Sequence, residues 1–158
     1  TAYTIECIGA DGQVKWSEEF HNLVTTAGLN DLLTQYFKGS AYTAAFYVGV
    51  TGATPTFAAG DTMASHAGWT ESSAYSQATR PALTLGTAAS GSIDNSASKA
   101  QFSINADATI GGAFLSTNST KGGTTGTLYG GGAFTEGNRV VKSGDTINVQ
   151  ATLTAASA

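Results

Sequence analysis

The side chains of this 158-residue chain that could bind a metal or perform catalysis are few: two histidines, one cysteine and eleven acidic residues. A zinc site needs three or four nitrogen, sulfur or oxygen ligands, usually at short spacings. Neither His21 nor His66 is followed within four residues by a second such ligand, and Cys7 has no partner for a disulfide or a cysteine-based zinc site. We therefore expect no metal centre and no cofactor. Instead, His21 is predicted at a strand end, and His66 is predicted to pack next to Trp69.

The same residues give little support for nucleophilic catalysis. A nucleophile needs a base within hydrogen-bond reach and a third group that orients the base. Cys7 and His21 could form such a dyad, but the alternation of residues 3–7 predicts that Cys7 points into a core. Ser65 and His66 are neighbours, so their side chains point apart on a helical turn. Because no G-x-S-x-G motif occurs either, we expect no enzyme.

The acidic residues have structural interpretations that involve no reaction. Asp11, Asp61 and Asp145 stand where a turn or a helix cap would use a carboxylate to accept backbone N–H bonds. Glu18 and Glu19 are adjacent and are predicted to be a solvated pair beside His21. The two carboxylates that face each other across a glycosidase cleft are therefore not expected.

Three motifs of small residues also resemble functional signatures without matching them. The glycine-rich segment 122–126 lacks the Gly-Lys-Ser/Thr ending of a phosphate-binding loop. The three glycines at 130–132 predict a β-bulge or a site where another backbone comes close. Asn118 begins a glycosylation sequon, which we interpret as a chance match.

The overall composition excludes several classes of partner. Seven Lys and Arg residues, a net charge of −4 and a pI near 4.9 do not supply the basic surface that nucleic acid requires. No apolar run approaches the roughly 20 residues that span a bilayer, so we expect no membrane contact. The first residues do not have the pattern of a signal peptide, and a single cysteine suits a reducing cytosol.

One amphipathic helix is predicted at about residues 26–38. Thr25 or Thr26 can cap its start, and Gly39 can end it in the left-handed conformation. Its large apolar residues recur at helical spacing: Leu29, Leu32, Leu33, Tyr36 and Phe37.

The rest of the chain is predicted to be mostly β. A hairpin is expected at residues 2–16, and Asp61 is expected to cap a single helical turn that ends at Gly68. Further strands are predicted at 46–50, 69–75, 80–86, 100–106, 108–116, 127–134, 138–142 and 146–153, with loops at 52–60, 87–98 and 116–126. This pattern predicts a single domain over residues 1–158, an antiparallel β-sandwich of jelly-roll-like or immunoglobulin-like type.

Six segments together resemble a known group of viral proteins. They are 22–29, 47–50, 61–71, 80–83, 92–97 and 110–115, and the similarity extends over roughly residues 22–154. The set is similar to small head proteins of tailed bacteriophages, in particular the cement or decoration proteins that bind outside the capsid shell.

The resemblance implies a structural virion protein, made in the host bacterial cytoplasm, that binds the capsid exterior and bridges subunits of the major capsid protein. It also implies self-association as a dimer or trimer, with no cofactor. We expect the exposed segments 52–68 and 116–126 to contact the capsid, together with residues 1–8, which could add a strand to a neighbouring sheet. The alternative is a tail or tail-tip module that binds a receptor in the manner of a lectin.

Overall fold

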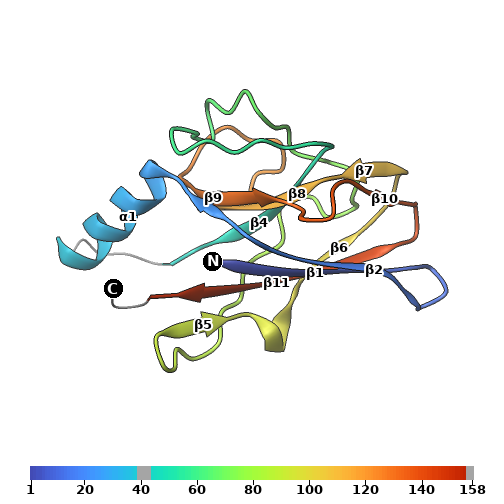
Figure 1. Cartoon of the computed structure of the whole chain (residues 1–158), viewed down its shortest axis with the longest axis horizontal. Helices are drawn as coiled ribbons and strands as arrows, with labels where there is room; N and C mark the ends of the chain where they lie inside the picture. Colours follow the sequence, from blue (N-terminus) through green and yellow to red (C-terminus); the bar gives the residue numbers. More distant parts are fainter. Residues whose placement is uncertain (39–43, 156–158) are drawn as a thin grey trace.

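The computed structural model describes residues 1–38 and 44–155, so the predicted helix stop at Gly39 lies outside the described residues. The chain is mostly β, with antiparallel sheets and one α-helix (Figure 1). In chain order the elements are β1 (Ala2–Ile8), β2 (Val14–His21), β3 (Leu23–Val24), α1 (Thr26–Phe37), β4 (Tyr47–Thr51), β5 (Ser92–Asp94), a short 3-10 helix η1 (Ser96–Ser98), β6 (Ala100–Ser103), β7 (Ala108–Ile110), β8 (Gly112–Ser116), β9 (Leu128–Ala133), β10 (Arg139–Val141) and β11 (Thr146–Thr154).

The first sheet has the order β2-β1-β11-β5, and β6 also pairs with β11. The predicted hairpin of β1 and β2 is confirmed, and β1 pairs along its other edge with β11, from Ala2 opposite Thr152 to Ile8 opposite Thr146. The expectation that residues 1–8 extend a neighbour's sheet is therefore wrong, because both edges of β1 are already hydrogen-bonded. Deleting this segment would remove an internal strand.

The second sheet has the order β3-β9-β8-β4, and β7 pairs with β10 in a separate two-stranded ribbon. Only Asn22 separates β2, in the first sheet, from β3, in the second, so the chain passes directly from one sheet to the other. Side chains of successive residues point to opposite faces of a strand. On β8, Ala113 and Leu115 join a large cluster with residues of the first sheet, whereas Phe114 joins a second cluster with Met63 and Trp69. The second sheet is thus buried on both faces.

The three glycines of β9 make this double burial sterically feasible. A Cβ on Gly130 would lie 2.5 Å from the carbonyl oxygen of Leu23, and one on Gly131 would lie 2.2 Å from the ring of Phe57. The pairing of β8 with β9 also shifts in register beside Leu115. Of the two alternatives predicted from the glycine run, the close approach of another backbone is confirmed, and the irregular register lies just before the run, at Tyr129.

Several predicted elements are absent from the region between β4 and β6. Residues 61–68 form no helical turn, because the Asp61 carboxylate accepts bonds from the Ala58 N–H and the Trp69 indole instead of capping a helix. Segments 69–75 and 80–86, which are predicted as strands, form only isolated β-bridges, at Glu71, Tyr75 and Ala82. The predicted loop 87–98 contains the short strand β5 and the 3-10 helix η1.

The helix begins where the sequence predicts, and its first turn is fixed to β9. Thr25 is the N-cap, and its hydroxyl oxygen accepts a bond from the Gly28 N–H at 3.1 Å. The same hydroxyl donates to the Leu128 carbonyl at 2.5 Å. Gly28 is buried against the backbone of Tyr129, where a Cβ would lie 2.4 Å from the carbonyl oxygen.

Replacing Gly28 by alanine tests this contact, because helix propensity and packing act in opposite directions. In an isolated helix Gly→Ala is stabilising by about 1 kcal/mol. Here we expect Gly28→Ala to lower the free energy of unfolding by about 1–3 kcal/mol, since the new methyl group meets fixed backbone. Urea denaturation measures the change. Gly60→Ala is the matched control, because a methyl group added there would meet nothing within 4 Å, and it should leave the midpoint nearly unchanged.

Candidate interaction surfaces

The apolar side of α1 faces solvent. The sequence pattern predicts an amphipathic helix whose apolar side is buried. In the structure, Gly28 is the buried residue of α1, and the large apolar side chains of the helix are not buried. Their exposed fractions are Leu29 49%, Leu32 50%, Leu33 54%, Tyr36 78% and Phe37 74%. We call these five residues the α1 stripe. On the surface of a folded protein, a contiguous apolar patch of this kind marks a site of interaction.

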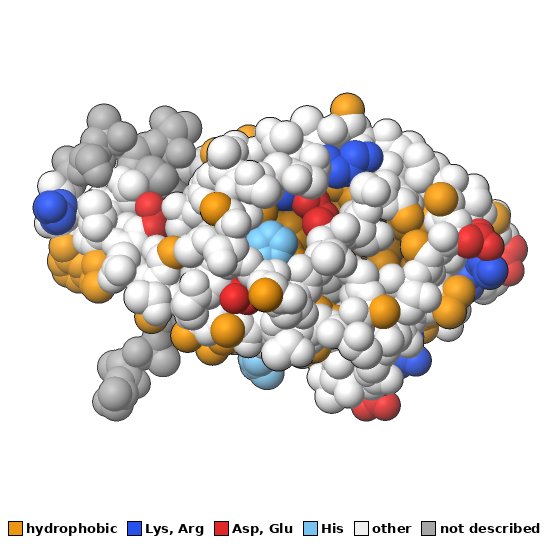
Figure 2. All heavy atoms as spheres, turned by 90° about the horizontal axis from the view of Figure 1, so that it is seen from above, with side chains coloured by type: hydrophobic (Ala, Val, Ile, Leu, Met, Phe, Trp, Pro, Cys, Tyr) orange, Lys and Arg blue, Asp and Glu red, His pale blue; other side chains and the backbone are white. Residues whose placement is uncertain are grey.

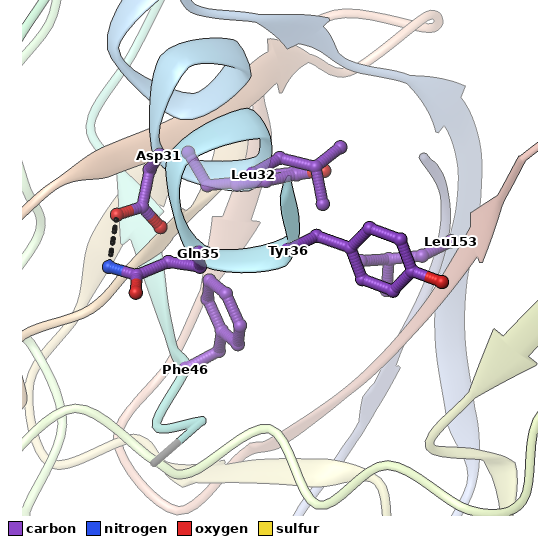
Figure 3. Close-up of a pocket in the computed structure, with 7 residues that line it drawn as sticks. Asp31, Leu32, Gln35, Tyr36, Phe46 and Leu153 are labelled. Atoms are coloured by element: carbon purple, nitrogen blue, oxygen red, sulfur yellow. Dashed lines mark hydrogen bonds between the residues drawn. The ribbon is translucent and has the colours of Figure 1, made fainter. Parts of the chain in front are cut away.

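A cavity of about 250 Å³ lies beside the stripe, between α1 and the body of the protein. Leu32 and Tyr36 line it from the helix, and Phe46 and Leu153 line it from the opposite side (Figure 3). At its edge, the Gln35 amide donates to the Asp31 carboxylate at 3.3 Å. The first turn of the helix is therefore packed tightly on β9, while the later turns stand over an apolar hollow.

A second candidate surface is formed by the loops that cover the outer face of the β9-β8-β4 sheet (Figure 1). A buried ion pair organises it. The Arg80 side chain has no exposed area, and its guanidinium donates to both oxygens of the Glu71 carboxylate, at 2.9 and 2.7 Å. The guanidinium carbon also lies 5.2 Å from the centre of the Phe114 ring. Arginine binds a carboxylate in this two-pronged way because its planar donors match the two oxygens.

The ion pair holds the loop 116–126 in place. Arg80 also donates to the carbonyls of Asn118 and Gly123, and the Gly122 N–H donates to Glu71. Lys121 donates to the Tyr75 carbonyl from above the tyrosine ring. The glycine-rich segment thus binds a carboxylate of its own chain with one N–H.

Aromatic packing orders the loop 52–68. The His66 ring stacks on Trp69 at 3.8 Å between centroids, which confirms the predicted packing of this histidine. Trp69 also stacks on Phe57 and contacts Phe114 of β8, so the loop is joined to the sheet beneath it. Seen from above, this side of the molecule is covered largely by uncharged atoms, with few charged groups (Figure 2).

The structure does not bring together the residues considered for nucleophilic catalysis. Cys7 pairs with Trp16 near one end of the β1–β2 hairpin, whereas His21 pairs with Ala2 at the other end, so the two cannot form a dyad. Cys7 is fully buried, as predicted, and its thiol donates to the Asp145 carboxylate at 3.6 Å. Burial, followed by the negative charge of Asp145, raises the pKa of the Cys7 thiol to about 11.

Two acidic residues have larger structural roles than the sequence indicates. The expectation that Glu18 is solvated with Glu19 is wrong, because Glu18 is 3% exposed and forms an ion pair with Arg139. Asp145 is buried at a turn, where it accepts from Lys15 and from the Lys142 N–H. Asp11 accepts from the Gln13 N–H, which confirms its predicted turn role.

Within residues 1–38 and 44–155, no three histidine, cysteine or acidic residues are grouped as a metal site would need. No helix in that part of the chain is long and apolar enough to cross a membrane.

No protein-family model matches the sequence, and no curated protein matches it significantly. Two candidate surfaces have been described among these residues: the α1 stripe and the face formed by loops 52–68 and 116–126, which we call the loop face.

Breaking the Arg80–Glu71 pair should be strongly destabilising. We expect Arg80→Met and Glu71→Gln each to lower the free energy of unfolding by about 3–5 kcal/mol, because each leaves a buried charge without its partner. The double variant should lose less than the sum of the two, as a double-mutant cycle by urea denaturation would measure. Additive losses would contradict a coupled pair. As a control, Lys142→Met removes an exposed pair with Asp107 and should leave the midpoint unchanged.

The Cys7 thiol should be unreactive in the folded protein. At pH 8 we expect iodoacetamide to label Cys7 only after denaturation, whereas a cysteine introduced by Ala64→Cys on the exposed loop should label at once.

The Cys7 thiol should also make the stability depend on pH. Its pKa of about 11 in the folded protein lies above the ordinary value of 9.0, so the unfolded chain loses the thiol proton first as the pH rises. The free energy of unfolding should therefore fall as the pH rises from about 9 to about 11. A Cys7→Ala variant should lack this part of the pH dependence.

Proposed function

We propose that this protein is a structural component of a bacteriophage virion that binds the outside of the capsid, bridges subunits of the major capsid protein and catalyses no reaction. The observation that carries the proposal is the loop face held by the buried Arg80–Glu71 pair. A buried pair of this kind fixes geometry, and here it fixes loops that present little charge. Loops that are ordered before binding lose less entropy when a partner covers them.

The chemistry of the loop tips fits a contact with a large protein surface. Residues 58–60 and 124–126 are exposed and consist of alanine, glycine and threonine. Such small side chains let a partner approach closely and give each contact only modest strength. Repetition of one modest contact around a shell produces strong overall attachment. The large cluster shared by the two sheets is also compatible with the antiparallel sandwich, jelly-roll-like or immunoglobulin-like, that the sequence pattern predicts.

Quantifying the protein in purified phage particles tests the proposal. We expect a copy number comparable to that of the major capsid protein, measured by quantitative mass spectrometry, and density on the outer shell in cryo-electron microscopy. A few copies at the tail would support the alternative, a tail or receptor-binding module, and would overturn the capsid proposal. Absence from the particle would overturn both.

Loop variants locate the contact. In add-back experiments with particles that lack the protein, we expect Ala64→Glu and Thr124→Glu to lower occupancy, because each places a charge on an exposed part of the loop face. Ala88→Glu makes the same kind of change on the exposed segment before β5 and should bind normally. Equal occupancy for all three variants would exclude the loop face as the contact.

A further inference from the structure

The α1 stripe is an exposed apolar surface that the other described residues leave largely uncovered. Its five side chains are half to three-quarters exposed, and Leu32 and Tyr36 continue into the cavity below the helix. We propose that the stripe is a dimer interface, occupied by the α1 stripe of a second copy of this chain. This proposal is separate from the capsid contact, which we place on the loop face.

The charge pattern of α1 favours a copy of itself over other occupants. The stripe contains no charged residue, and the charged groups of the helix region, Asp31 and Lys38, lie on another side of the helix at 3.6 residues per turn. A charged partner would find nothing to pair with on the stripe. Helices that lie on membranes carry many Lys and Arg residues on the polar face, whereas this chain has a net charge of −4.

The exposed area is sufficient for a dimer. An aromatic side chain buries about 200 Å² when fully packed, so Tyr36 and Phe37, at 78% and 74% exposed, leave about 300 Å² to be covered. The three half-exposed leucines add nearly as much. Complete cover of the stripe on two copies would thus bury at most about 1,200 Å² in total, the lower end of the range for specific, stable interfaces.

The spacing of the stripe suits packing of two helices around a twofold axis. Residues at i, i+3, i+4 and i+7 form one face of a helix, and the ridges of such a face fit the grooves of an identical one. An axis near Leu33, the middle of the stripe, would bring the two copies of Leu33 together and place Leu29 of each copy opposite Phe37 of the other. A twofold interface of this kind joins the same patch on both subunits.

Sedimentation velocity over a dilution series tests the proposal. We expect the native chain to dimerise and Leu33→Glu to raise the dissociation constant about 30-fold or more, the loss that follows removal of a buried anchor. Thr34→Glu places the same charge on the adjacent, exposed position outside the stripe and should dimerise like the native chain. Circular dichroism checks that both variants remain folded.

Disulfide trapping gives a second measurement that does not depend on affinity. Cys7 is fully buried, so a cysteine introduced by Leu33→Cys is the reactive thiol of that variant. Under mild oxidation we expect Leu33→Cys to form disulfide-linked dimers and Thr34→Cys to dimerise without becoming cross-linked. A native chain that stays monomeric at the highest concentration, or that binds phosphatidylglycerol vesicles as a monomer, would overturn the proposal. Dimers unaffected by Leu33→Glu would overturn it as well.

Discussion

A guanidinium with no access to water must have its donors matched inside the fold, and Arg80 imposes this constraint on the whole loop face. Its partners are the Glu71 carboxylate and two backbone carbonyls of a loop some forty residues further along the chain. The irregular segments above the second sheet are consequently fixed by polar contacts and by a small aromatic cluster around Trp69. The pair of Glu18 with Arg139 acts similarly, by joining β2 to β10.

The regular elements could be predicted from the sequence because each has a local signal. Alternation identifies β1 and β11, and the Thr25 cap identifies the start of α1. The surroundings of the helix could not be read in this way. The pattern of Leu29 to Phe37 is the same whether a helix buries its apolar face or exposes it, and only the packed structure distinguishes the two cases.

The organisation of the candidate surfaces was less predictable, because it depends on contacts between distant segments. Nothing near Arg80 or Glu71 in the sequence marks them as a buried pair. Glu18 stands beside another acid, a pattern typical of solvent, and its burial follows from the position of Arg139, 121 residues away. The glycines at 130–132 were informative because their lack of a side chain is itself a packing requirement.

The pairing of β1 with β11 has a consequence for how the chain is made. Ala2 hydrogen-bonds within a ladder whose other side includes Thr152, so the interior of the first sheet cannot close until the residues of β11 have left the ribosome. Until then the early hairpin keeps one edge unsatisfied, and such edges recruit strands from other molecules. Contacts between distant segments also slow folding. The protein is therefore most vulnerable to aggregation during its own synthesis, and slower translation of the middle of the chain would lengthen that period.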